Sequence, residues 1–182
     1  DEEYIINIVE NSLNNLGIKK YHCILLHRPL QLLTDRNRKI VKSLNRLKST
    51  GMIDKIGISI YSPDELESVI NIMDLDIVQA PLNILDQRMY HSGWLAELDK
   101  QGIQFHARSI FLQGLLLMTK ERMTNKFNQY EKIWTKWHKW LSIKKLSPLE
   151  TCLNFVNNIN HVNKIVIGIQ SEKQLIEIMN IQ

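Results

Sequence analysis

Polar or small residues follow the ends of five short apolar runs, and several have side chains of the types that bind ligands or transfer protons. They are His27, Ser59, Gln79, Arg108 with Ser109, and Gly168 with Ser171. A neutral imidazole at His27 could donate a hydrogen bond to a carbonyl oxygen, and Gln79 has the donors and the acceptor to hold a carboxamide. Taken singly, each has a structural alternative, such as a histidine bonded to nearby backbone or a surface glutamine. Five such endings in succession favour a functional site, because buried polar groups cost free energy unless they are paired.

The turn Gly168-Ile-Gln-Ser171 comes directly before a predicted helix. Free backbone N–H groups and the positive end of the helix dipole at such a turn can hold a phosphate, and Lys173 could add a positive charge. The alternative is an ordinary capping box, because Ser171 and Gln174 have the spacing of one.

Three tryptophans alternate with basic residues late in the chain. Trp134, Trp137 and Trp140 lie among lysines, and this composition can bind single-stranded nucleic acid. A spacing of three also places the indoles near one helical face, which favours packing in the core or between helices. The net charge is only +4, from 23 Lys and Arg and 19 Asp and Glu, so the sequence predicts no nucleic-acid partner.

Residue spacing excludes several other kinds of site. The seven glycines include no Gly-x-Gly-x-x-Gly loop and no loop ending in Gly-Lys-Ser/Thr, and no Cys-x-x-Cys or His-x-x-x-His pair occurs. These absences argue against a Rossmann domain, a nucleoside triphosphatase and a metal site. No apolar run approaches the roughly 18 residues of a membrane span, so no membrane is expected. Cys23 and Cys152 lie far apart in apolar surroundings, which favours a reducing compartment and a cytoplasmic location.

Alternating strands and helices must position these residues. The apolar runs typical of buried strands are 21–27, 55–59, 76–79, 102–107 and 164–168. Helical patterns or helix-start signals lie between them, at about 4–16, 34–50, 62–73, 94–99, 124–141, 147–156 and from 171 onward. Five strands, each followed by a helix, predict a parallel sheet in one α/β domain. Ligands of such folds bind outside the carboxyl ends of the strands, where the polar residues lie.

Start signals and apolar faces are clear for several of these helices. Ser62-Pro-Asp-Glu65 and Ser147-Pro-Leu-Glu150 each combine a capping serine, a proline suited to the first turn and a glutamate, which is typical of a helix start. The first helix is expected to present one apolar face, made by Tyr4, Ile5, Ile8, Val9, Leu13 and Leu16.

The strand endings, in this order, resemble those of the aldo-keto reductase family. The matching segments are Leu25-Leu-His-Arg-Pro29, Lys55-Ile-Gly-Ile-Ser59, Val78-Gln79 with Leu85-Asp-Gln-Arg88, Ser109 with Leu112-Gln-Gly-Leu-Leu116, and Val166-Ile-Gly168 with Ser171 to Leu175. The resemblance covers nearly the whole chain and implies a (β/α)8 TIM barrel. It places the chain from the helix before the fourth strand onward. Residues 1–182 are therefore expected to form a single aldo-keto-reductase-like domain, an incomplete barrel of about five βα units that lacks its N-terminal strands.

The resemblance also implies roles for individual residues. His27 would be the catalytic histidine that orients the carbonyl, and Ser59 and Gln79 would bond the nicotinamide carboxamide. Arg108 stands where many members have a tyrosine that stacks on the nicotinamide, and a guanidinium can also stack on a flat ring. The other implied cofactor contacts are Ser109, Gln113 and Gly114 along the ribose and phosphates, and Gly168, Ser171 and Gln174 at the adenosine end.

Besides Arg108, the sequence departs from the family pattern in three further respects. Ile60 follows the serine where members usually have asparagine, and Ile178 occupies a place often held by an adenine-binding asparagine. NADP is the cofactor that the resemblance implies, and NAD is the alternative. The family's proton-donating tyrosine, with the lysine and aspartate that lower its pKa, lies on strands that this sequence does not contain. Carbonyl reduction needs a proton source near the developing oxyanion, so residues 1–182 alone are expected to show little or no turnover.

The sequence thus predicts an NAD(P)H-dependent oxidoreductase that reduces an aldehyde or ketone, such as a sugar-like carbonyl. Its expected partner is a small-molecule carbonyl substrate, and the sequence leaves its oligomeric state open. One alternative is a non-catalytic relative used for cofactor binding or protein interaction, which the departures at Ile60, Arg108 and Ile178 favour. Another is a nucleic-acid-binding domain built on the tryptophan and lysine segment, which would bind with steep salt dependence.

Overall fold

The computed structural model describes residues 2–119, 122 and 125–181. The strands are β1 (Tyr21–Leu26), β2 (Ile53–Ser59), β3 (Ile77–Pro81), β4 (Gln104–Arg108) and β5 (Val162–Ile165). The α-helices are α1 (Glu2–Leu16), α2 (Asn37–Ser49), α3 (Pro63–Val69), α4 (Arg88–His91), α5 (Trp94–Lys100), α6 (Glu131–Lys144), α7 (Pro148–Asn157) and α8 (Glu172–Met179). Short 3-10 segments are η1 (Pro29–Leu33), η2 (Leu115–Leu117) and η4 (Asn125–Tyr130).

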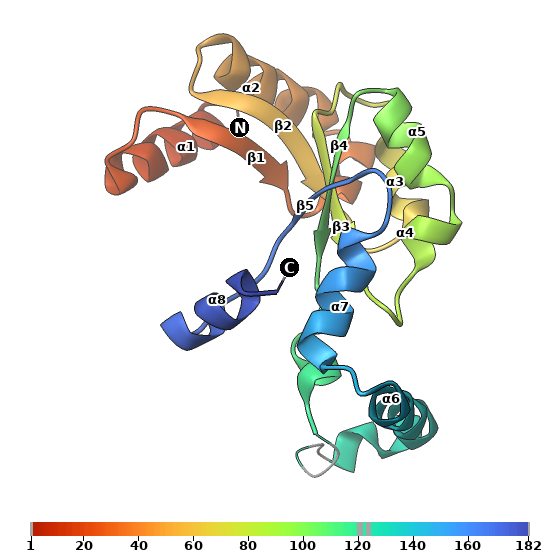
Figure 1. Cartoon of the computed structure of the whole chain (residues 1–182). Coiled ribbons are helices and arrows are strands. Elements are labelled where there is room, and N and C mark those ends of the chain that lie inside the picture. The colour runs from red at the N-terminus through yellow and green to blue at the C-terminus, as the bar shows by residue number, and fades with distance from the viewer. Residues whose placement is uncertain (1, 120–121, 123–124, 182) are drawn as a thin grey trace.

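The strands form one parallel sheet in the order β1-β2-β3-β4-β5, which confirms the sheet predicted from the sequence. Each connection between neighbouring strands carries at least one helix, as parallel pairing requires. Figure 1 shows the sheet at the centre, with α2 at one end of the molecule and α6 at the other. Among the described residues β1 and β5 do not pair with each other, so the sheet stays open. The carboxyl ends of all five strands meet at one edge, and the predicted site residues lie in the carboxyl-terminal parts of the strands or in the segments that follow them.

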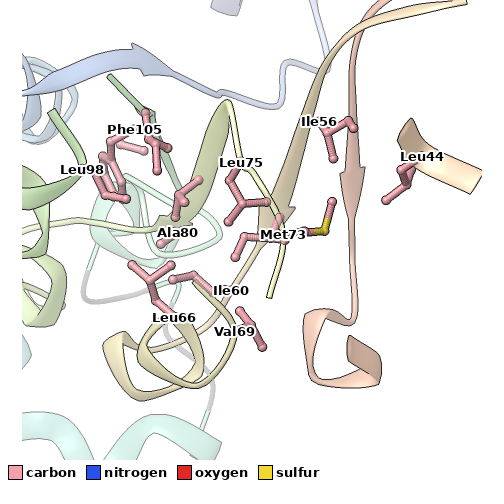
Figure 2. Packing of buried hydrophobic residues seen from close by; sticks show 14 of the residues in the cluster. Leu44, Ile56, Ile60, Leu66, Val69, Met73, Leu75, Ala80, Leu98 and Phe105 are labelled. Atoms are coloured by element: carbon pink, nitrogen blue, oxygen red, sulfur yellow. The ribbon is translucent and has the colours of Figure 1, made fainter. Parts of the chain in front are cut away.

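The main hydrophobic core fills the space between one face of the sheet and its helices. Leu44 of α2, Leu66 of α3 and Leu98 of α5 are buried there. Figure 2 shows them around strand residues that include Ile56 and Phe105. Full burial of one such side chain stabilises the fold by roughly 1.5–3 kcal/mol, so the helices hold the strands, and with them the strand ends, in place.

Helix α1 buries a narrower face than the sequence predicts. Ile6, Val9 and Leu13 are buried, whereas Tyr4 is 66% and Ile8 49% exposed. The prediction of an inward face that includes Tyr4, Ile8 and the exposed Leu16 is therefore wrong. The helix packs against α2 along a stripe centred on Ile6, Val9 and Leu13. Tyr4 and Ile8 lie outside this stripe by their helical angle of about 100° per residue, and Leu16 lies at the helix end.

Two of the three predicted capping serines cap their helices. Ser62 Oγ accepts a hydrogen bond from Glu65 N (3.4 Å), and Ser171 Oγ accepts one from Gln174 N (3.3 Å). Helix α7 begins at Pro148 as expected, but the Ser147 side chain makes no capping bond, so that part of the prediction is wrong. The Ser147 carbonyl instead accepts from Thr151 N and from Thr151 Oγ1.

The last strand and the tryptophan helix begin at other residues than expected. Strand β5 covers Val162–Ile165 rather than 164–168, because Val162 pairs with Phe105 and a bulge follows, where Asn163 Oδ1 accepts from Phe105 N. The helix expected from about Thr124 to Leu141 begins at Glu131 and is preceded by η4. Thr124 itself lies outside the described residues.

The tryptophans of α6 serve mainly as packing residues, as their spacing predicts. Trp134 and Trp137 are buried in a second cluster with Leu116 and Cys152. Trp137 Nε1 donates to the Leu116 carbonyl (3.1 Å), which fixes α6 on the loop after β4. Trp140 stacks on Trp137 with a centroid distance of 5.7 Å and is 42% exposed.

Both cysteines are expected to resist thiol reagents in the folded protein. Burial raises the pKa of Cys152 to about 12 and that of the half-buried Cys23 to about 11. At pH 8 almost no thiolate is then present, and the thiolate is the reactive form. Timed reaction with Ellman's reagent should modify Cys23 slowly and Cys152 only after unfolding. Fast modification of Cys152 in the folded protein, read by mass spectrometry, would contradict this assignment.

Candidate cofactor and active site

Ser59, the last residue of β2, forms a hydrogen-bonded pair with Gln79 in the middle of β3, which continues to Pro81 beyond its predicted end at Gln79. The two residues are register partners, and Ser59 Oγ lies 3.3 Å from Gln79 Oε1. Ser59 is buried and Gln79 is half-buried. If the hydroxyl donates to Gln79 Oε1, the Gln79 Nε2 donors and the Ser59 lone pairs stay open. These open groups are complementary to a carboxamide, whose oxygen could accept from Gln79 Nε2 and whose nitrogen could donate to Ser59 Oγ.

His27 follows the edge strand β1 directly. Leu26 pairs with Ile58, so the register places His27 at the level of Ser59 on the neighbouring strand. The residue is exposed, and no hydrogen bond joins it to another described residue. The structure therefore leaves the imidazole free to meet a ligand, and it does not join His27 to Ser59 or Gln79.

Arg108 reaches from the end of β4 across to the segment after β2. Its guanidinium donates to the Ile60 carbonyl (2.9 Å) and to Ser109 Oγ (3.3 Å). The Arg108 Cζ atom also lies 4.5 Å from the ring centroid of Tyr61. Arg108 pairs in register with Pro81, two residues beyond Gln79, so strand alternation puts it on the same face as Gln79 and next to it along the strands.

The loop after β3 is held by its own polar network. The buried Asn83 accepts backbone bonds from Leu85 N and Asp86 N at Oδ1, and its Nδ2 donates to the Ser109 carbonyl (3.1 Å). Arg88 donates twice to Asp86 (2.7 and 2.8 Å), and this guanidinium holds the pKa of the Asp86 carboxyl below its usual value. These contacts fix the loop beside the start of the segment after β4.

A cavity of about 900 Å³ joins the loop after β4 to the loop after β5. Five of the residues predicted to contact the cofactor line it, namely Ser109, Gln113, Gly114, Gly168 and Gln174. Ser171 does not line it and instead caps α8. Arg122 and Glu177 contribute the charged groups of the lining. The structure thus brings together two segments that lie about 55 residues apart in the sequence. The volume of the cavity between them is in the range of ligand sites, roughly 300–1,000 Å³.

The loop after β4 has an unusual backbone. Ser109, Leu112 and Gln113 all adopt positive φ, at 57°, 47° and 55°, and Gly114 follows at 88°. Non-glycine residues take this conformation at a cost, and such residues concentrate at ligand sites. The positive φ angles therefore give the loop that lines the cavity a tightly turned shape, which extended backbone would not provide.

The turn before α8 offers fewer free N–H groups than the sequence suggests. The Ser171 hydroxyl accepts a hydrogen bond from Gln174 N, and Gln174 Oε1 accepts one from Gln170 N (2.8 Å). Among the described residues no hydrogen bond occupies Glu172 N or Lys173 N. The capping box thus leaves two N–H groups of the first helical turn open, and such groups can donate to an anion.

His106 is a buried residue on the face of the sheet that carries Gln79, and it was not predicted from the sequence as part of the site. It pairs in register with Gln79 on one side and Lys164 on the other. Burial, followed by the positive charge of Lys164 and then that of Lys55, holds its pKa below the usual value, and its Nε2 has no partner among the described residues. The sequence does carry a signal that could have identified His106. In β4 the polar residues Gln104, His106 and Arg108 alternate with buried apolar residues, which places all three on one face of the sheet.

Other kinds of site find no support in the described part of the chain. No group of three His, Cys, Asp or Glu residues could hold a metal ion there. None of the described helices is long and apolar enough to cross a membrane.

Comparison with known proteins decides the family. The model of the Aldo/keto reductase family matches residues 1–182. The chain belongs to the aldo/keto reductase family. A search of curated protein sequences finds no match.

Solved structures of other aldo/keto reductases share the fold. The apo form of aldo-keto reductase AKR11C1 from Bacillus halodurans matches with a TM-score of 0.79 and 20% identity, over 97% of this chain and 61% of that chain. The glycerol dehydrogenase AKR11B4 from Gluconobacter oxydans matches with a TM-score of 0.69 and 19% identity, over 99% and 64%. This aldo/keto reductase chain thus spans less than two thirds of these relatives, and its five-stranded sheet is an incomplete TIM barrel.

Proposed function

We propose that this protein binds a nicotinamide dinucleotide, NADP with NAD as the alternative, and takes part in reducing an aldehyde or ketone. The observation that carries the proposal is the cavity of about 900 Å³ shared by the loops after β4 and β5. The cavity lies in the loops after β4 and β5, and the Ser59–Gln79 pair, which does not line it, lies on the neighbouring strands β2 and β3 of the same sheet. A ligand that reaches from the cavity to this pair would be elongated, with a carboxamide at one end. A holo form of the Bacillus halodurans relative, with a TM-score of 0.79, agrees with cofactor binding in this fold.

Each group of residues would have a distinct task. Ser59 and Gln79 would hold the carboxamide through the open donor and acceptor described above. Gln113, Gly114 and the N–H groups that begin α8 would contact the phosphates and the adenosine end. The bound cofactor would supply the hydride.

His27 would orient the carbonyl substrate. Its exposed ring at the end of β1 can donate a hydrogen bond to the carbonyl oxygen. The family's proton-donating tyrosine has no counterpart in this sequence, so we expect residues 1–182 alone to bind cofactor with little or no turnover. A small carbonyl compound as substrate and a cytoplasmic location, with neither nucleic acid nor membrane as partner, complete the proposal.

Replacement of His27 by alanine in the natural full-length protein should lower kcat/KM for carbonyl reduction at least about 100-fold, the low end of what a positioned acid–base group contributes. The matched control is His22→Ala, because His22 is an exposed histidine of the same strand and points to the opposite side. Kinetics with NADPH and NADH test this, and binding of each is measured by the fluorescence of the reduced nicotinamide. Binding without any carbonyl reduction would instead support the non-catalytic relative.

A further inference from the structure

The guanidinium of Arg108 is held in one position by three contacts. It donates to the Ile60 carbonyl and to Ser109 Oγ, and it stacks over the Tyr61 ring at 4.5 Å. Two of these partners, Ile60 and Tyr61, directly follow Ser59 in the chain. These contacts therefore hold the positive charge in one position beside the Ser59–Gln79 pair.

Tyr61 is itself anchored at both of its backbone polar groups. Its N–H donates to Glu65 Oε2 (2.8 Å), and its carbonyl accepts from Arg88 Nη2 (3.0 Å). These bonds fix the backbone of Tyr61, and its exposed ring lies against the Arg108 guanidinium. Such a cation over an aromatic face gains attraction from the ring quadrupole.

The charge of Arg108 is not neutralised by a nearby carboxylate. Among the described residues no Asp or Glu oxygen lies within ion-pair distance of it. Asp86 is the acidic group whose pKa Arg108 also affects, but both of its oxygens are taken by Arg88. A net positive charge therefore remains at the carboxyl ends of the strands, next to the groups proposed to hold the carboxamide.

We propose that Arg108, held in place by Tyr61, makes this site bind the reduced cofactor in preference to the oxidised one. The inference rests on the proposed function. The carboxamide is attached to the nicotinamide ring, so a carboxamide held by Ser59 and Gln79 places the ring near Arg108. The oxidised ring carries a positive charge and the reduced ring is neutral, so Arg108 repels only the oxidised form. Such a bias favours entry of the reduced cofactor and release of the oxidised one, which is the direction of carbonyl reduction.

The test is the ratio of two dissociation constants, Kd for NADP⁺ over Kd for NADPH, measured by titration calorimetry without any substrate. The ratio should be at least about tenfold in the unaltered protein and should fall by about fivefold or more in Arg108→Gln, where a tenfold change equals ~1.4 kcal/mol. Glutamine keeps a donor for the Ile60 carbonyl but no charge. Tyr61→Leu should lower the ratio as well, because it frees the guanidinium, and Tyr61→Phe should restore it.

Arg28→Gln is the matched control, because Arg28 is an exposed arginine at the same edge of the sheet. NADPH carries one more negative charge than NADP⁺, and loss of a remote cation should change the ratio by less than about twofold at physiological salt. The inference is overturned if Arg108→Gln weakens both ligands equally, or if Arg28→Gln changes the ratio as much. If neither ligand binds the unaltered protein, the proposed function fails, which is a different result from an unchanged ratio.

Discussion

Replacing Gly57 by alanine is expected to lower the free energy of unfolding by about 3 kcal/mol, the upper part of the range for overpacking a filled interior. A Cβ at this position would lie 2.4 Å from the Ile77 carbonyl oxygen and 2.6 Å from Leu25 Cδ2. The oxygen belongs to the backbone of β3, which pairs with strands on both sides and cannot withdraw. Urea unfolding of the two proteins, followed by circular dichroism, measures the difference.

Gly168→Ala is the matched control for this substitution. Its Cβ would meet nothing within 4 Å, and its backbone is not in the left-handed region. The free energy of unfolding should change by less than about 0.5 kcal/mol, as for substitutions outside packed positions. Equal stability of Gly57→Ala and Gly168→Ala would show that β2 and β3 are not packed as described. The point bears on function, because Gly57 lies two residues before Ser59 and its close packing sets the distance between Ser59 and Gln79.

The parallel sheet could be predicted because its signals are local. Short apolar runs end at His27, Ser59 and Gln79, and helix-start signals such as Ser62 follow them. Both signals are short-range, because strand geometry and helix capping each involve residues only a few positions apart in the sequence. The buried face of a helix was harder to predict, since a helical pattern of apolar residues does not say which neighbouring element covers it. The exposed Tyr4 and Ile8 of α1 show this, because the covering partner α2 selects the stripe.

The chemistry of the site was only partly visible in the sequence. Ser59 and Gln79 could be named because each ends an apolar run of the sequence, and the register of β2 with β3 then pairs them. The shared cavity of Gln113 and Gly168 could be expected only from the family resemblance, since no local pattern joins positions 55 residues apart. Contacts such as Arg108 on Tyr61 depend on how three strand ends are placed relative to one another, and a single sequence carries no measure of that.

Replacing Gly168 by leucine is expected to weaken NADPH binding at least about 100-fold, or ~2.8 kcal/mol, while the fold stays intact. Gly168 lines the cavity proposed for the cofactor, and no atom lies within 4 Å of its Cβ position. A leucine can therefore be accommodated by the backbone, but its branched side chain must extend into space that the ligand needs. Titration of both proteins with NADPH, read by the fluorescence of the reduced nicotinamide, gives the two dissociation constants.

Graded substitution at Gly168 separates a blocked site from a damaged fold. Alanine adds one methyl group and should weaken binding by no more than about fivefold, which is less than ~1 kcal/mol, whereas leucine should nearly abolish it. The urea midpoint of both variants should match that of the unaltered protein, since neither side chain meets a neighbouring atom at Cβ. If Gly168→Leu binds NADPH as tightly as the unaltered protein, the cavity between the loops after β4 and β5 is not where the cofactor lies. The Ser59–Gln79 pair would then have to hold its ligand along another path over the strand ends.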